Sequence, residues 1–423
     1  MSEMTFGDLL VQKDGLIRGP FGGDIKKSLF VPKAADTYKV YEQGVVLNHD
    51  INRGDYYVSK EYFEKKLKRF EVKENDILLT GAGTLGELFV VPTNAPKGVI
   101  NQALLRIRLN KDVVNQNFFC YYFKYYIKAI IGNINGDSVI PNLPPLPIIK
   151  STVIDIPDIT YQQKIAAVLS ALDAKIELNQ RINAELESMA KTLYDYWFVQ
   201  FDFPNEKGKP YKSTGGKMVW NEELKREIPL GWEVDNVLRI GDLLGGGTPK
   251  TKEPSYWGGD IPFFTPKDTD DSIFVLKTLD YITEAGLESC SSRLYPKGTI
   301  FITARGTVGN INVAAQDMAM NQSCYAIQPK PEINYYFLHQ CSENLVHYLK
   351  AKSNGSIFDA IVSNDIKLTP IVIPPLPLIQ EFGKITKDMY EKILVNKKES
   401  QTLTELRDWL LPMLMNGQVE IKG

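Results

Sequence analysis

Charge of one sign, histidine and closely spaced cysteine are all scarce in this chain of 423 residues, and each shortage excludes a class of protein. The chain has 49 Lys and Arg against 51 Asp and Glu, a net charge of −2, so it is neither a basic tail protein nor an acidic solvating one. Its four cysteines lack C-x-x-C spacing, which argues against a zinc site or disulfide framework and suits a reducing cytosol. With only three histidines, we predict no metal site.

Long apolar segments are also missing. The N-terminus has no apolar core typical of a signal peptide. No run reaches the roughly 18 apolar residues that a membrane span needs. We therefore expect a cytoplasmic protein without membrane association. Apolar residues make up 43% of the chain and charged residues 24%, ordinary values for a globular core, and the length favours two or three domains.

Four short landmarks occur twice along the chain in the same order. They are Gly7–Leu10 and Gly241–Leu244, Thr80–Gly86 and Thr303–Gly309, Asn101-Gln102 and Asn321-Gln322, and Ile156-Pro157 and Ile373-Pro374. The offsets between copies are 234, 223, 220 and 217 residues. Because four matches in order are hard to obtain by chance, the pattern indicates one duplicated unit with small loop deletions.

Each copy begins with short β-like runs and turns, continues into an aromatic helix and ends in a proline-rich extended segment. The predicted strands include 76–79, 103–107, 299–302 and 324–327, the helices 118–131 and 335–350, and the extended segments 141–157 and 370–377. Proline disfavours helix in the extended segments. A Gly- and Pro-rich stretch, 203–232, is predicted to connect the first copy to the second.

A long amphipathic helix closes each copy, over about 160–198 and 377–415. Apolar residues recur there at three- and four-residue spacings, a heptad pattern typical of a coiled coil. One such stripe is usually a core helix of a bundle, but two matched stripes most simply pack on each other. If the helices are antiparallel, their centres meet at Asn179 and Asn396, and we expect these two side chains to pair on a pseudo-two-fold axis and fix the register.

The predicted fold is therefore α+β. Two globular α/β units are expected at opposite ends of a rod of roughly 58 Å, formed by two long helices in an antiparallel coiled coil with internal pseudo-two-fold duplication. The predicted boundaries are 1–157 for the first unit, 158–202 for the first helix, 203–374 for the connector with the second unit, and 375–423 for the second helix.

A glycine-rich turn offers a possible nucleotide site. Gly81, Gly83 and Gly86 match G-x-G-x-x-G, whose phosphate-binding form needs a helix directly afterwards. The following residues, 87–92, read as a strand, and the second copy keeps only the last two glycines, Gly306 and Gly309. We therefore predict structural hairpin turns with positive φ. No G-x-S-x-G, H-E-x-x-H or kinase motif appears, so no catalytic residue is predicted. A nucleotide-dependent enzyme using the turn 81–86 remains an alternative.

Cations gather beside glycine-rich loops in both copies. In the first copy they are Arg18, Lys26 and Lys27, and Lys65, Lys66, Lys68 and Arg69; in the second copy Lys250, Lys252, Lys267 and Arg305 occur with Thr248 and Thr251. The stretch 65–69 could equally be a solvated helix face. Glycine beside cations in both repeats favours close backbone approach to nucleic acid. The near-zero net charge favours a protein that binds nucleic acid together with partners.

Several motifs along the whole chain resemble those of type I restriction-modification specificity subunits. They are Gln163–Ile176, Asn183–Glu187, Trp197–Asp202, Gly215–Trp220 and Ile228–Trp232, with the turns Thr80–Gly86 and Thr303–Gly309. The resemblance implies two target recognition domains, each reading one half of a bipartite DNA site. It also implies that the coiled coil sets the gap between half-sites.

The resemblance further implies a non-catalytic chain. Two methyltransferase subunits would dock on the helices, and restriction/translocase subunits would join them. S-adenosylmethionine, ATP and Mg²⁺ would belong to those partners. By position, the cations and threonines named above would contact double-stranded DNA. A two-domain coiled-coil scaffold without a DNA role is the other alternative.

Overall fold

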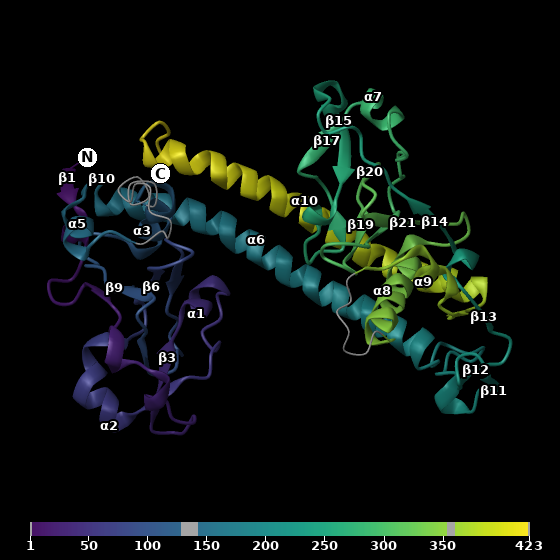
Figure 1. Cartoon of the computed structure of the whole chain (residues 1–423), viewed down its shortest axis with the longest axis horizontal. Helices are drawn as coiled ribbons and strands as arrows, with labels where there is room; N and C mark the ends of the chain where they lie inside the picture. The colour runs from purple at the N-terminus through teal and green to yellow at the C-terminus, as the bar shows by residue number, and fades with distance from the viewer. Residues whose placement is uncertain (1, 128–142, 353–359, 422–423) are drawn as a thin grey trace. The chain divides into compact units, whose positions relative to one another are not determined.

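The computed structural model describes residues 2–127, 143–352 and 360–421. The chain forms two compact units, unit 1 (Met1–Ala174 with Leu403–Gly423) and unit 2 (Lys175–Thr402). Two long helices, α6 (Ile159–Tyr194) and α10 (Leu376–Met415), contribute residues to both units (Figure 1). The predicted boundaries set the helices apart from the globular parts, whereas each compact unit contains a segment of both helices.

Unit 1 contains two four-stranded sheets. The first has the order β2-β9-β6-β7, and all its neighbours are antiparallel. The second has the order β4-β3-β8-β5, and its β3–β8 pair is parallel. The strands are β2 (Leu16–Arg18), β3 (Thr37–Tyr41), β4 (Tyr57–Ser59), β5 (Glu71–Val72), β6 (Ile77–Thr80), β7 (Leu88–Val90), β8 (Gly98–Ile100) and β9 (Leu104–Ile107).

Unit 2 repeats this topology. Its sheets have the orders β14-β21-β18-β19-β16 and β17-β15-β20, so the first four strands of the larger sheet correspond to β2-β9-β6-β7. The β15–β20 pair is parallel, like β3–β8. The strands are β14 (Gly241–Gly245), β15 (Trp257–Phe264), β16 (Phe274–Val275), β17 (Asp280–Ile282), β18 (Ile300–Thr303), β19 (Ile311–Ala314), β20 (Ala319–Met320) and β21 (Cys324–Pro329). The duplication predicted from four landmarks is therefore present in the strand order.

One antiparallel strand pair precedes the long helix in each unit. In unit 1, β1 (Ser2–Thr5) pairs with β10 (Val153–Ile156), and in unit 2, β13 (Glu233–Asp235) pairs with β22 (Ile371–Ile373). The extended prediction for 141–157 was wrong in part, because α5 (Leu146–Ser151) lies inside it. Pro147 is in the first turn of this helix, where proline costs no hydrogen bond.

Aromatic helices complete each unit. α3 (Gln116–Tyr122) continues as one π-helical turn, η6 (Phe123–Ile127), and α8 is Tyr335–Lys352. The remainder of the first helix prediction, 128–131, and the start of the extended segment, 141–142, lie outside the described residues. Shorter elements are α1 (Gln43–Leu47), α2 (Lys60–Tyr62), α7 (Glu284–Glu288), α9 (Ser363–Leu368), β11 (Met218–Asn221) and β12 (Arg226–Pro229). The last two form a hairpin within the predicted connector.

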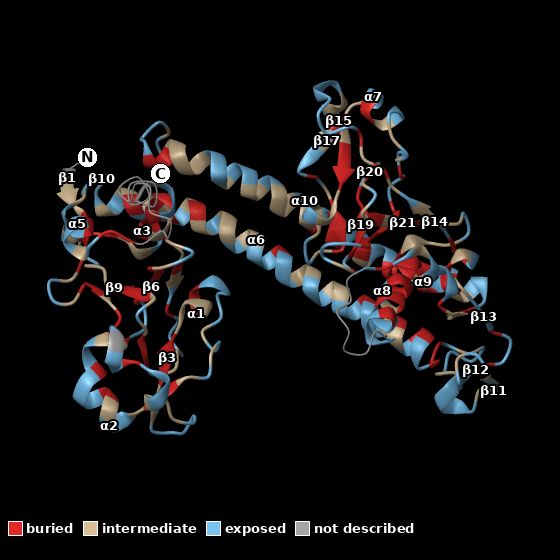
Figure 2. Ribbon diagram, in the orientation of Figure 1, coloured by how far each residue is buried: buried red, intermediate tan, exposed pale blue. Residues whose placement is uncertain are grey.

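Each unit buries its own apolar core (Figure 2). In unit 1, Phe118 and Phe119 of α3 share a cluster with Ile165 and Leu169 of α6. In unit 2, an aromatic cluster joins α8 and α10 to the π-helical turn η7 (Asp195–Val199), which directly follows α6. Within it, the Phe198 ring centroid lies 5.0 Å from that of Phe337 and 5.3 Å from that of Phe382. The apolar stripes of the long helices are thus part of the core of each unit.

Within unit 2 the two long helices pack antiparallel, as predicted. Nδ2 of Asn179 lies 3.5 Å from the backbone oxygen of Asn396 and 3.3 Å from Oγ of Ser400. Nδ2 of Asn396 donates to Oδ1 of Asn183 at 2.9 Å. The repeat offset of 217 residues relates Asn179 to Asn396 and Asn183 to Ser400. The Asn179–Ser400 contact therefore corresponds to the Asn396–Asn183 contact, so the pseudo-two-fold relation holds here. The expected pairing of the Asn179 and Asn396 side chains with each other is replaced by these two crossed contacts.

Among the residues that the structure describes, none of the helices combines the length and apolar character needed to cross a lipid bilayer.

Candidate nucleic-acid interface

The glycine-rich motif of unit 1 forms the hairpin turn between β6 and β7. Gly83 and Gly86 have φ of 69° and 78°, a region that glycine occupies without steric cost. Thr80 closes the turn, because its carbonyl oxygen accepts the Gly86 N–H at 3.2 Å and its hydroxyl accepts the Glu87 N–H at 2.9 Å. A strand follows instead of a helix, so the turn lacks the helix N-terminus that binds phosphate in a dinucleotide loop.

Unit 2 builds the same turn between β18 and β19. Gly306 and Gly309 have φ of 82° and 77°. The carbonyl oxygen of Thr303 accepts the Gly309 N–H at 2.8 Å, and its hydroxyl accepts the Asn310 N–H at 2.9 Å. Ala304 takes the place of Gly81. The backbone N–H of each residue donates at 2.8 Å to the oxygen of the residue directly before a neighbouring strand, β9 for Gly81 and β21 for Ala304. The sequence repeat therefore marks one hairpin geometry made twice.

An asparagine turn lies beside each hairpin. Oδ1 of Asn101 accepts the Ala103 N–H at 3.0 Å, and Oδ1 of Asn321 accepts the Ser323 N–H at the same distance. A glycine from a third segment packs against each asparagine. A Cβ on Gly19 would lie 1.9 Å from the backbone oxygen of Asn101, and one on Gly246 would lie 2.2 Å from the backbone oxygen of Asn321. Only glycine permits this approach of two backbones.

Three segments thus meet at the same end of the sheet in each unit. We call 18–23, 80–86 and 101–102 the unit 1 turn cluster, and 245–252, 303–309 and 321–322 the unit 2 turn cluster. In unit 1, Nη2 of Arg18 donates to the Gly81 oxygen at 3.1 Å, and Nε2 of Gln43 donates to the Ala82 oxygen at 2.9 Å. The Arg18 guanidinium lies 5.4 Å from the ring centroid of Phe21, whose side chain is 64% exposed.

The unit 2 turn cluster brings together several of the predicted residues. The Thr248 hydroxyl donates to Oε1 of Gln322. Arg305 is exposed in the hairpin turn, at the position of Ala82 in unit 1. Lys267 lies in the short turn Pro266–Asp268, whose Pro266 oxygen accepts from the Thr307 hydroxyl at 3.4 Å. The glycine-rich loop 245–252, which carries Thr248, also exposes Lys250, Thr251 and Lys252.

The basic stretch 65–69 divides between two environments. Lys65 and Lys66 are exposed on a π-helical turn, Phe63–Leu67, and form no side-chain hydrogen bond or ion pair within the described ranges. Lys68 pairs with Glu64 at 2.7 Å, and this hydrogen bond raises the pKa of Lys68. Phe63 and Leu67 share a buried cluster with Ile25, which anchors the loop carrying Lys26 and Lys27. Those two lysines are also exposed and have no such partner in the described residues.

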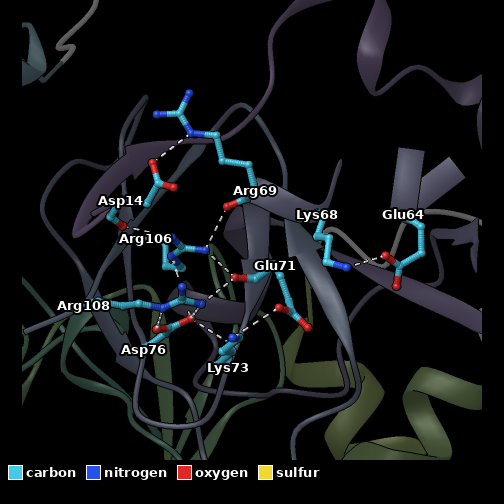
Figure 3. A network of polar contacts seen from close by, with 9 residues as sticks. All are labelled: Asp14, Glu64, Lys68, Arg69, Glu71, Lys73, Asp76, Arg106 and Arg108. Carbon is cyan, nitrogen blue, oxygen red and sulfur yellow. Dashed lines mark hydrogen bonds and ion pairs between the residues drawn. The ribbon is translucent and has the colours of Figure 1, made fainter. Parts of the chain in front are cut away.

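Arg69 belongs to the polar network drawn in Figure 3. The network includes Asp76, which directly precedes β6, so it lies at the opposite end of this strand from the hairpin. Nε of Arg69 pairs with Asp14 at 2.9 Å, and the carbonyl oxygen of Arg69 accepts from Arg106 at 3.1 Å. Asp76 binds Arg108 through two hydrogen bonds of 2.6 and 2.9 Å. Burial lowers the pKa of Arg106 to about 10. Asp76 to Gly81 spans about 17 Å of strand, so the network lies outside the unit 1 turn cluster.

Several side chains of the turn clusters are not among the residues predicted from the sequence. Gln102 and Gln322 are exposed at equivalent positions. Gln43 braces the unit 1 hairpin, and Phe21 is exposed beside Arg18. The sequence carries a signal for the two glutamines, because Asn-Gln is one of the four landmarks that occur in both copies. Within the described residues, no group of three or more His, Cys, Asp or Glu side chains could hold a metal ion.

Comparisons with known proteins agree with a duplicated DNA-reading chain. A family model described as the type I restriction modification DNA specificity domain matches twice, over residues 23–188 and 229–405. The two matches together span most of the chain, which defines a protein with two DNA specificity domains. The chain belongs to the type I restriction-modification specificity subunit family.

Known specificity subunits are similar to this chain over most of its length. The specificity subunit of the type I restriction enzyme MjaIX from Methanocaldococcus jannaschii is 28% identical over 96% of this chain and 89% of its own. The HindI specificity subunit from Haemophilus influenzae is 28% identical over 82% and 87%. A type I restriction-modification S subunit from M. genitalium has a similar fold, with a TM-score of 0.57, 17% identity, and coverage of 100% of this chain and 96% of that one.

Proposed function

We propose that this chain is the sequence-specific DNA-binding subunit of a type I restriction-modification complex, with one recognition domain for each half of a bipartite site. The observation that carries the proposal is the turn cluster built twice with the same backbone geometry. Gly19 and Gly246 each bring a loop against an asparagine turn, beside a hairpin turn of the same kind. One interface made twice on one chain suits a site read in two parts, as spaced half-sites are by dimeric readers.

The exposed cations beside each cluster supply the attraction to DNA. Lys26 and Lys27 in unit 1, and Lys250 and Lys252 in unit 2, form no ion pair within the described residues, so their charges are available to phosphates. Lys267 and Arg305 lie at the unit 2 turn cluster itself. Lys65 and Lys66 extend the basic surface of unit 1, whereas Lys68 and Arg69 are already paired with carboxylates.

The chain acts without chemistry of its own. The glycine-rich turns serve as structural hairpins, so S-adenosylmethionine, ATP and Mg²⁺ belong to partner subunits in this proposal. Two methyltransferase subunits dock on α6 and α10, and restriction/translocase subunits join them. Large apolar side chains exposed on these helices support docking there, since an exposed Trp or Met on a helix is a common interface residue; they include Met189, Ile385, Val395 and Trp409.

Footprinting of the chain in complex with its methyltransferase subunits tests the proposal. The probe is a pool of duplexes enriched for binding from random sequence. We expect two short protected blocks separated by an unprotected gap of constant length. A single continuous block contradicts one domain per half-site. Absence of protection, with the complex still assembled, favours the scaffold alternative. Nucleotide turnover by the chain alone favours the enzyme alternative.

A further inference from the structure

The two glutamines that follow the asparagine turns have the properties of base-reading residues. Gln102 and Gln322 occupy equivalent positions, and both side chains are exposed where the three segments of each turn cluster meet. A glutamine presents one acceptor and one donor side by side, the pair that recognises N6 and N7 of adenine in the major groove. Lysine side chains, in contrast, are long and flexible, and they suit contacts to phosphates, which carry no sequence information.

We propose that Gln102 and Gln322 read base edges, one in each half-site, and that the neighbouring loop residue, Phe21 or Thr248, determines how each glutamine is used. This inference deepens the proposed function and rests on it. The equivalence of the loop residues follows from the two glycines that touch the asparagine turns. Phe21 comes two residues after Gly19, and Thr248 comes two residues after Gly246.

In unit 2, Thr248 holds Gln322 in one orientation. Its hydroxyl donates to Oε1 of Gln322, which leaves both Nε2 hydrogens and one Oε1 lone pair for a base. The contact is possible because Gly246 packs on the Asn321 backbone and the Gly247 N–H donates to the Met320 oxygen at 3.1 Å. A glutamine oriented before binding loses less side-chain entropy on the DNA. Thr248 is then a positioning residue, in place of the direct DNA contact expected from its position.

In unit 1 the corresponding position is apolar. Phe21 has no hydroxyl to offer, and within the described residues the Gln102 side chain forms no hydrogen bond. The Phe21 ring is 64% exposed and lies beside the Arg18 guanidinium, at 5.4 Å. An exposed ring at a reading surface suits contact with a thymine methyl group. The two units therefore share one reading position and differ in its neighbour, which gives the two half-sites different sequences.

The test measures base preferences of the complex with its methyltransferase subunits on a pool of randomised duplexes. Gln322→Ala is expected to lose at least about fivefold preference at one base pair of one half-site and to leave the other half-site unchanged. Thr248→Val is expected to lose part of the same preference, and Thr248→Ser to retain it. Gln102→Ala is expected to act on the other half-site. Gln316→Ala, an exposed glutamine at the far end of β19, is the matched control.

The outcomes separate this inference from the proposed function. If the wild-type complex selects no split motif, the proposed function fails and the inference falls with it. If a split motif is selected but Gln322→Ala and Gln102→Ala keep every base preference, only the inference is overturned. A uniform loss of affinity with a shallower salt dependence would mean phosphate contact and also overturns it. An unchanged preference in Thr248→Val overturns the positioning role.

Discussion

Replacing Asp76 with Asn tests whether the buried network of unit 1 holds the sheet that carries the hairpin turn. The Asp76 side chain is 3% exposed and that of Arg106 is 1% exposed. Asp76 also accepts the Lys73 N–H at 2.7 Å in addition to its two bonds from Arg108. The neutral amide keeps the shape but removes the charge that compensates two guanidinium groups. Breaking a buried pair from one side costs about 3–5 kcal/mol.

We expect the lower end of that range, because backbone oxygens also bind Arg106. A decrease of about 3 kcal/mol in the free energy of unfolding accelerates amide exchange roughly 150-fold where exchange requires opening of the unit. Hydrogen exchange with mass spectrometry on peptides covering β6 and β9 measures it. Asp14→Asn is the matched control, because its partner Arg69 is 66% exposed and such pairs contribute about 1 kcal/mol or less. Similar small accelerations in both variants would refute the reasoning.

Three further predictions concern the basic loop, a glycine and a buried carboxyl. Changing Lys26 and Lys27 together to Ala should weaken binding to all duplexes and reduce the salt slope by about 2, measured by titration at several salt concentrations; an unchanged slope contradicts phosphate contact. Gly246→Ala should abolish selective binding, because its Cβ would lie 2.2 Å from a backbone oxygen, whereas Gly245→Ala meets nothing within 4 Å and should bind normally. Burial raises the pKa of Glu187 to about 7, so the folded state binds this proton more tightly and stability should fall as pH rises from about 4.5 to 7. Glu187→Gln should remove that decline in denaturant unfolding measured across this pH range.

The duplication and the long helices were predictable because their signals are local and repeated. Positive φ at Gly83 and Gly306 follows from the need for a tight hairpin, and the same spacing in both copies makes the pattern visible in one sequence. The heptad stripes predicted antiparallel helices meeting near Asn179 and Asn396. Local rules failed at Pro147, where proline opens a short helix instead of preventing one, since either outcome agrees with its fixed φ.

Contacts between distant segments could not be obtained from the sequence. The bond from Thr248 to Gln322 joins residues 74 apart, and the pair of Arg69 with Asp14 joins residues 55 apart. Each depends on strand pairing that no local pattern specifies. The sequence therefore does not distinguish Arg69, which is paired with Asp14 at the far end of β6, from Arg305, which is exposed in the hairpin turn. The polar neutral side chains beside the glycines were the harder part of the site to recognise.

If each unit reads one half of a split DNA site, the positions of methylated adenines will show it. They can be mapped in DNA modified by the complex of this chain with its methyltransferase subunits. We expect one motif in two specific parts, separated by a gap of constant length and unrestricted sequence. A contiguous motif, or methylation without sequence preference, would contradict this expectation.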